Sequence, residues 1–387
     1  MARSYKKDTI KLSFDQKERA LSVLRTLIRC HYFGNHVPHD AELSRLLRIP
    51  RSSLILALNH LMAEGLITSS KAEEGWDVVD LDILQRVAHV AFVVNTDPLH
   101  GWFSLFQDWL IGFEQVFFEE GYQTRLLCSF SSVEEKIQKI TTFREEGGMA
   151  CVLASRAESV ISQAILEAGI PSVVMGNCSI HLDGMGSVCS DNIAGANQAV
   201  DFLAENNHRL IYMYVTGLNF HHGFVERYMG YQQAMKRHHL VPHTSLAFNE
   251  PHSDLSARRA ADMILRMKHR PSALLCGSDR EAFEIVSELR HLGIHVPQDI
   301  SVVGFDNNHY GSLLEPPMTT IDIFAVNMGQ IAAHYLLNEM QSPQLPVKIQ
   351  VPTELVIRSS VLTVPGKKNQ PAPNAPYTGD SGRILNY

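Results

Sequence analysis

From residue 89 to about residue 314, short apolar runs of strand length alternate with stretches of helical periodicity. An apolar strand at 90–94 leads into a helix in which Phe106, Phe113 and Phe117 recur at helical spacing. The alternation continues through a strand at 125–128, a helix at 133–145, a strand at 150–153 and a helix at 160–168. Strands that alternate with helices are typical of an open parallel sheet covered by helices. The sequence therefore predicts an α/β body over residues 89–362.

Two segments of this body repeat one order of features: a helix end, a glycine, a proline, a strand and a second glycine. They are residues 167–177 (E-A-G-I-P-S-V-V-M-G-N) and residues 292–306 (L-G-I-H-V-P-Q-D-I-S-V-V-G-F-D). Two similar lobes, each with its own parallel sheet, would produce such a repeat. We therefore expect a body of two lobes.

Polar side chains gather where the strands of the body end. In open α/β sheets, ligands bind beyond the carboxyl ends of the strands, so these residues are candidates for holding a ligand between the lobes. Arg227, at the start of a helix, offers a rigid fork of donors, and Asp306 offers two acceptors. The strand-end candidates are Asn95, Asp97, Asn177, Ser278 and Asp306. This set suits a sugar or a similar polar metabolite.

Other interpretations of these residues remain open. Arg227 could pair with a structural carboxylate, and Asp306 could merely end its strand. Trp102 and Phe103 could provide a stacking face in the cleft or belong to the core. Adjacent histidines at 221–222 and 238–239 do not face one site, and no carboxylate lies at ligand spacing, so we predict surface histidines and no metal.

The first eighty residues have a different character. A Ser13–Gln16 capping box opens a helix, and two further helices are expected at 40–48 and 51–64, the last ended by Gly65. Short apolar stretches at 66–68 and 76–79 have the length of two hairpin strands. Three helices followed by a hairpin predict a winged helix-turn-helix. A helical interaction domain without DNA contact is the alternative.

The third helix would enter the major groove of DNA with its first turn. Arg51, Ser52 and Ser53 would then face base edges, while Arg45 and Arg48 would contact phosphates and Gly75 would belong to the wing. Residues 1–60 hold 11 Lys and Arg against 5 Asp and Glu, a net charge of +6, whereas the whole chain carries −7. A basic head on an acidic body fits a DNA-binding head.

Residues 15–80 resemble the GntR family of regulators. The agreement lies in Pro38, Glu42-Leu43, Arg51, Ala57-Leu58, Leu61 and Glu64-Gly65-Leu66-Ile67. The chain departs from the pattern at Ala41 and Ile55, where the family usually has arginine, and at Pro50, where it has a Ser or Thr cap. Of the family's arginine contacts only Arg51 is retained, so the resemblance carries no operator sequence over to this chain.

The body resembles the LacI family sensor, itself similar to periplasmic sugar-binding proteins. Six segments in order carry the likeness: V-C-S-D-N-I-A-G-A at 188–196, E-R-Y-M-G-Y at 226–231, P-S-A-L-L-C-G-S-D at 271–279, G-I-H-V-P-Q-D-I-S-V-V-G-F-D-N at 293–307, P-P-M-T-T-I at 316–321 and V-I-R-S-S-V at 356–361. The resemblance implies that Arg227 and Asp306 contact an effector and that Ser278 lies beside it. We expect Asp279 to cap the helix that follows. Head and body together resemble hybrid regulators such as the arabinose-responsive repressors.

Several classes of protein are disfavoured. No apolar run approaches a membrane span, and no apolar core follows the charged N-terminus, so neither a transmembrane segment nor a secretory signal is expected. No nucleophile motif, zinc-protease motif or phosphate loop occurs, which argues against an enzyme and against a bound cofactor. The six cysteines form no CxxC pair, and we expect reduced, buried thiols.

The combined expectation is a cytoplasmic homodimer that binds a double-stranded DNA operator under the control of a sugar-like effector. Its fold would be α/β, with an N-terminal winged helix-turn-helix and a two-lobed, periplasmic-binding-protein-like sensor. The expected division is residues 1–80 for the head, 81–88 for a linker, 89–362 for the effector-binding body and 363–387 for a disordered tail. A solute-binding receptor without a DNA-binding role is the alternative, and an enzyme that uses the cleft is a third possibility.

Overall fold

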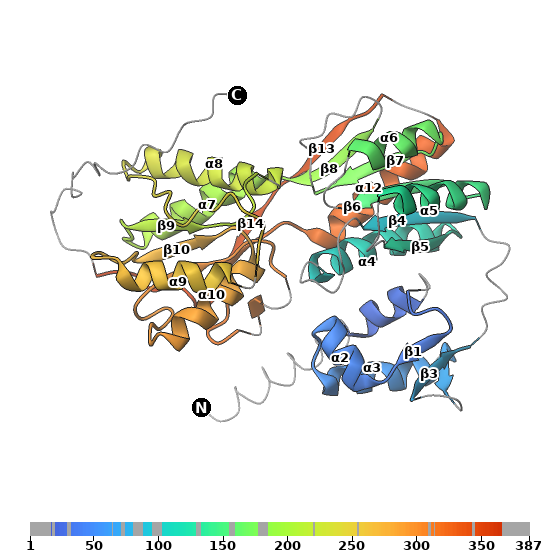
Figure 1. Cartoon of the computed structure of the whole chain (residues 1–387), viewed down its shortest axis with the longest axis horizontal. Helices are drawn as coiled ribbons and strands as arrows, with labels where there is room; N and C mark the ends of the chain where they lie inside the picture. Colours follow the sequence, from blue (N-terminus) through green and yellow to red (C-terminus); the bar gives the residue numbers. More distant parts are fainter. Residues whose placement is uncertain are drawn as a thin grey trace.

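The computed structural model describes residues 17, 20–28, 32–63, 65–70, 74–79, 88–94, 103–128, 133–154, 159–176, 185–219, 221–253, 255–308, 311–312, 314–342 and 345–365. They form a small head, coloured blue in Figure 1, and two α/β lobes that lie side by side. Each part has its own sheet. The expectation of two lobes, rather than one undivided body, is therefore met.

The head contains helical residues 20–28, helices α2 (Asp40–Leu47) and α3 (Arg51–Ala63), and three short strands. The strands β1 (His36–Pro38), β2 (Ile67–Ser69) and β3 (Gly75–Val78) form an antiparallel sheet in the order β1-β3-β2. Strands β2 and β3 are the expected hairpin. Strand β1 was not expected from the sequence.

The N-terminal lobe is built on a six-stranded sheet in the order β13-β8-β7-β6-β4-β5, and every neighbouring pair is parallel. Its strands are β4 (His89–Val94), β5 (Gln123–Cys128), β6 (Ala150–Ala154), β7 (Ser172–Met175), β8 (Gly186–Ser190) and β13 (Lys348–Val351). Its helices are α4 (Phe103–Glu119), α5 (Val133–Glu145), α6 (Ser159–Glu167) and α12 (Ala325–Gln341). The parallel sheet agrees with the prediction from strand–helix alternation.

Side-chain alternation along β4 shows why this sheet needs helices on both faces. Phe92 packs in one core with Phe113 and Phe117 of α4, whereas Ala91 and Val93 join a second core with residues of α5 and α6. A strand whose two faces are both buried is apolar throughout, as residues 90–94 are. The stripe of phenylalanines that the sequence indicated is thus core.

The C-terminal lobe has a parallel sheet in the order β11-β10-β9, together with an antiparallel pair, β12-β14. Its strands are β9 (Ile211–Tyr214), β10 (Ala273–Cys276), β11 (Ser301–Val303), β12 (Thr320–Asp322) and β14 (Glu354–Val356). Its helices are α7 (Asn192–Glu205), α8 (His222–Arg237), α9 (Ser256–Arg266) and α10 (Asp279–His291). The internal repeat supplies β7 to one lobe and β11 to the other, as a two-lobed body requires.

The chain passes between the lobes in three places, after β8, before α12 and after β13. Two of these crossings are tied together, because Asp191 N donates to Val351 O at 2.8 Å and Thr353 Oγ1 contacts Asp191 O at 3.4 Å. At the third, Phe324 has a left-handed φ of 53° and its N–H donates to Asp322 Oδ1 at 2.7 Å. The two lobes are thus connected by three crossing segments.

Three expectations need correction. Ser278, not Asp279, caps α10, since Ser278 Oγ accepts from Glu281 N at 3.2 Å. Cys189 is disulfide-bonded, so the six cysteines are not all thiols. Val364, placed in the expected tail, is hydrogen-bonded to the C-terminal lobe at Asn206 and Asn207. The last two depend on proximity in space, which residue spacing along the chain does not reveal.

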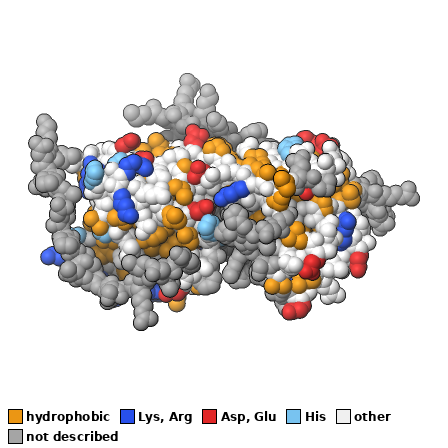
Figure 2. Space-filling model, turned by 90° about the horizontal axis from the view of Figure 1, so that it is seen from above, with side chains coloured by type: hydrophobic (Ala, Val, Ile, Leu, Met, Phe, Trp, Pro, Cys, Tyr) orange, Lys and Arg blue, Asp and Glu red, His pale blue; other side chains and the backbone are white. Residues whose placement is uncertain are grey.

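Among the described residues, no helix is both long enough and apolar enough to cross a bilayer. Figure 2 shows one face of the molecule, on which acidic and basic side chains are interspersed over both lobes. That face of the body carries no broad field of positive charge.

Candidate effector-binding site

Arg227 lies in α8 at the centre of a buried polar cluster in the C-terminal lobe, with only 5% of its surface exposed. Its Nε donates to Asn192 Oδ1 at 2.8 Å, and its Nη1 donates to Gly277 O at 2.6 Å. Its Nη2 lies 2.8 Å from Asp306 Oδ1. The guanidinium carbon also lies 3.8 Å from the centre of the Phe305 ring. Four segments far apart in the sequence thus meet at one side chain.

Close helix packing sets the position of Arg227. A Cβ on Gly230, one turn later in α8, would come within 2.5 Å of Ile193 O in α7, so glycine lets the two helices approach. This approach places Arg227 over Asn192, the first residue of α7. The Asn192 amide is oriented in turn, because its Nδ2 donates to Glu226 Oε2 at 2.9 Å. Asn192 is a site residue that sequence reasoning placed only at a crossover.

Asp306 follows β11 with a φ of 106°, a region that side chains other than glycine rarely adopt, and Asn307 after it has a φ of 49°. The carboxyl group of Asp279 accepts two hydrogen bonds from residues around this turn. Its Oδ2 accepts from Asn308 N at 2.8 Å, and its Oδ1 accepts from Thr320 Oγ1 at 2.6 Å. Strained backbone of this kind persists where the surrounding structure enforces it, and it is frequent at ligand sites.

The buried carboxylates of this cluster are held at altered pKa values. Burial, reinforced by the nearby charge of Asp306, raises the pKa of Asp279 to about 8. Burial also raises the pKa of Asp306, although the Arg227 guanidinium opposes that shift. The pKa of Glu281 is raised to about 7 by burial, against the effect of hydrogen bonds from Thr216 N and Oγ1, each 2.7 Å long. Desolvated ionisable groups at strand ends are typical of functional sites.

The predicted site residues divide between the lobes. In the C-terminal lobe, Arg227 and Asp306 are in direct contact, and Ser278 follows Gly277, whose carbonyl binds Arg227. Ser278 is buried and serves as a helix cap. Of the candidates in the N-terminal lobe, Asn95, Asp97, Trp102 and Asn177 lie outside the described residues, as does the side chain of Phe103 at the start of α4.

The head presents a second set of predicted residues. The Arg51 side chain is 63% exposed and pairs with Asp40, whose pKa it lowers through that hydrogen bond. Arg45, Arg48 and Ser52 are also exposed. Ser53 corrects the expectation, because only 5% of it is exposed and it faces the core of the head, where base edges cannot reach it. Ser53 is buried because it follows the exposed Arg51 and Ser52 in the helix and falls on the side that packs against the head.

Gly75 has a packing role. It begins β3 with a φ of 142°, and a Cβ there would come within 2.4 Å of Val37 O in β1. Any larger residue would push the two strands apart. A contact between this glycine and DNA stays a prediction.

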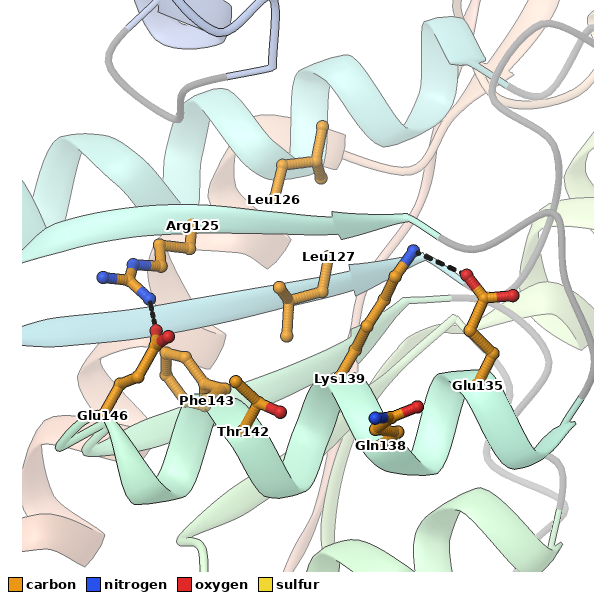
Figure 3. A pocket seen from close by; sticks show the side chains of 9 residues that line it. All are labelled: Arg125, Leu126, Leu127, Glu135, Gln138, Lys139, Thr142, Phe143 and Glu146. Atoms are coloured by element: carbon orange, nitrogen blue, oxygen red, sulfur yellow. Dashed lines mark hydrogen bonds and ion pairs between the residues drawn. The ribbon is translucent and has the colours of Figure 1, made fainter.

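A groove of about 450 Å³ lies between β5 and α5 of the N-terminal lobe (Figure 3). Arg125 pairs with Glu146 across one end of it, and Lys139 Nζ lies 3.7 Å from Glu135 Oε1 at the other. These pairs are well exposed to solvent, where such interactions contribute little. The groove is separate from the cluster around Arg227 and contains none of the predicted site residues.

Comparisons with known proteins identify a family model and relatives that match parts of this chain. Residues 200–361 match the model of a periplasmic binding protein-like domain. The HTH-type transcriptional repressor PurR of Glaesserella parasuis is 28% identical over 267 residues, which cover 66% of this chain and 77% of that protein. PurR of Klebsiella pneumoniae is 29% identical over 256 residues, 65% of this chain and 74% of that protein.

Solved structures show the same fold. The transcriptional regulator CelR in complex with cellobiose is 22% identical, with a TM-score of 0.64 over 84% of this chain and 100% of that one. A LacI family regulator from Enterococcus faecium with bound ribose is 19% identical, with a TM-score of 0.61 over 71% of this chain and 100% of that one. The body of this chain therefore has the periplasmic-binding-protein-like fold that these LacI family regulators share, and residues 200–361 match the corresponding family model.

Proposed function

We propose that this chain is a DNA-binding transcriptional repressor controlled by a small polar effector, a sugar or a similar metabolite, that binds between the two lobes. The observation that carries the proposal is the contact of Arg227 with Asp306 at the carboxyl ends of the C-terminal lobe's strands. An arginine held by three partners is pre-organised, so little freedom is lost when a hydroxyl-rich ligand binds beside it. Ribose and cellobiose in the related structures support a sugar-like effector.

The head is proposed to be a winged helix-turn-helix of the GntR type. Helices α2 and α3, a short turn between them and the β2–β3 hairpin support this interpretation. The exposed Arg45, Arg48 and Arg51 would contact phosphates and base edges. A GntR-type head on a LacI-type body would make the chain a hybrid regulator similar to the arabinose-responsive repressors.

The regulator would act in the cytoplasm as a homodimer, and its two-fold axis would impose a roughly palindromic operator. Effector binding would favour closure of the lobes about the three crossing segments, and closure would change the freedom of the heads through the linker at 81–88. The effector can do this only by binding the closed state more tightly than the open one. Couplings of this kind are commonly about 1–3 kcal/mol. We propose that the operator is released when the effector binds.

A thermal-shift screen of the full chain against monosaccharides would identify the effector, because a ligand that binds only the native state raises the unfolding temperature. Gel shifts on DNA from upstream of the chain's own gene would then be run with and without each stabilising sugar. We expect specific binding that the effector weakens. Stabilisation by a sugar with no specific DNA binding would favour the alternative, a solute-binding receptor. Turnover of the sugar would contradict the proposal outright.

A further inference from the structure

The solvent-facing side of α3 carries two large aliphatic side chains. Ile55 is 42% exposed and Leu56 is 51% exposed, although the opposite side of the same helix, with Leu54, Leu58 and Leu61, is fully buried. Ser52 and Asn59, also exposed, lie on the same side one turn before and one turn after them. The side of α3 that points away from the head thus carries two adjacent aliphatic groups between the polar side chains of Ser52 and Asn59.

These exposures are those of the whole chain, so no described residue of the lobes covers this surface. Adjacent exposed aliphatic groups on a helix mark a contact surface more often than an isolated one does. The surrounding charge indicates what the contact is. Arg45, Arg48 and Arg51 are exposed next to the start of α3, and residues 1–60 carry a net charge of +6.

We infer that Ile55 and Leu56 contact the 5-methyl groups of thymines in the major groove, so that this head selects thymine at the centre of each half-site. The inference rests on the proposed DNA-binding function and deepens it. A helix that enters the groove by its N-terminal half brings residues of its second turn to base edges. The thymine methyl is the apolar group that base pairs present there. Aliphatic side chains can therefore select thymine without a hydrogen bond.

The same surface excludes another mode of recognition. The GntR-like pattern usually has arginine at the position of Ile55, and an arginine there could grip guanine or a phosphate. Isoleucine can do neither. Direct contact with guanine would then depend on Arg51, which Asp40 holds in place at the start of the helix.

The test uses duplexes that the full-length protein selects from a random pool. Each selected duplex is remade with deoxyuridine in place of thymidine, one position at a time, which removes a methyl group and leaves base pairing and charge unchanged. We expect a three- to fivefold loss of affinity at one or two positions of each half-site, on the order of one buried methyl group.

Ile55→Ala and Leu56→Ala should weaken binding to the thymine duplex by a similar factor and should abolish its sensitivity to uracil. Met62→Ala is the matched control. Met62 is 41% exposed on the same side of α3, but it lies about 10 Å further along the helix, beyond the reach of the groove. It should leave affinity unchanged. All three residues are exposed, and unchanged thermal unfolding would verify that the head still folds.

The outcomes separate this inference from the proposed function. Specific binding that uracil does not weaken at any position would overturn the inference and leave the proposed repressor intact. Failure to select any duplex would contradict both the inference about thymine and the proposed DNA-binding function. If Ile55→Ala weakened self-association in sedimentation and left DNA affinity unchanged, the exposed side of α3 would bind a second copy of the chain, and the inference would be wrong.

Discussion

Arg227 and Arg51, the two arginines that the sequence marked out, stand in opposite environments. Arg227 is buried in the C-terminal lobe with Asn192, Gly277 and Asp306 as partners. Arg51 lies at the surface of the head and, among the residues that the structure describes, pairs with Asp40. The buried arginine is fixed before any ligand arrives, whereas the exposed one can exchange its carboxylate for DNA. Substitution of Arg227 should therefore affect folding and binding together, and substitution of Arg51 should affect binding only.

The largest effect is expected from Arg227→Ala. It leaves the Asp306 carboxylate buried without its cation, and breaking a buried pair in this way costs about 3–5 kcal/mol. Urea unfolding of the full chain would measure the loss, and the thermal shift caused by the effector should vanish. Arg237→Ala is the control, since its pair with Asp201 is exposed and should contribute less than about 1 kcal/mol. Equal losses in the two variants would contradict the contrast between buried and exposed arginines.

Glu281→Gln tests the buried cluster without breaking its hydrogen bonds, because the amide oxygen can still accept from Thr216 N and Oγ1. The pKa of Glu281 is about 7 in the folded chain and 4.5 without burial. Between these values the folded state binds more protons than the unfolded state, so the free energy of unfolding falls as pH rises.

The variant should lack this part of the slope and should be more stable than the wild type at pH 8, by about 3 kcal/mol. Near pH 4 the two proteins should be alike, which serves as the internal control. Urea titrations between pH 4 and pH 8 would measure both. Asp279, whose pKa is about 8, would preserve a residual slope in the variant. A wild type with no slope in this range would show that neither carboxyl is protonated as described.

Arg51→Ala tests the expectation that the exposed arginine affects DNA binding only. Loss of one arginine contact to a base edge should weaken operator binding about 10- to 100-fold. The urea midpoint and the thermal shift caused by the effector should stay unchanged, because the pair with Asp40 is at the surface. Fluorescence anisotropy with labelled operator would measure affinity. A variant that also lost its effector response would contradict the division between head and body.

The smallest effect is expected from Arg45→Ala. An exposed arginine that neutralises one phosphate should reduce the slope of log affinity against log salt by about 1 and should weaken all duplexes alike. Binding measured at several salt concentrations would show this. Arg266→Ala, an exposed position on α9 of the C-terminal lobe, should leave the slope unchanged. A change in sequence preference with Arg45→Ala would instead place this residue at a base edge.

Much of the body followed from local pattern. The helix expected at 133–145 is α5, and the strand expected at 90–94 is β4 with one residue added. These elements carry strong periodicity, which depends on residues near one another in the chain. Strand β13 had no such signal, because it joins the N-terminal sheet only through its pairing with β8. In the head, the second and third helices began within one residue of expectation, whereas β1 formed only because β3 pairs with it.

The candidate site likewise has features that the sequence predicts and features that depend on tertiary contacts. Local sequence patterns predicted the alternation of strands and helices in the body and its division into two lobes, and they singled out Arg227 and Asp306, since each of these features is encoded by neighbouring residues or a short motif. The three-dimensional structure was needed to show that Asn192 and Asp279 belong to the same cluster, that Ser53 faces inward and that Cys189 is disulfide-bonded. Burial and hydrogen bonding depend on which distant segments meet. Packing over the whole chain determines which segments come together, so no short stretch of sequence predicts these contacts.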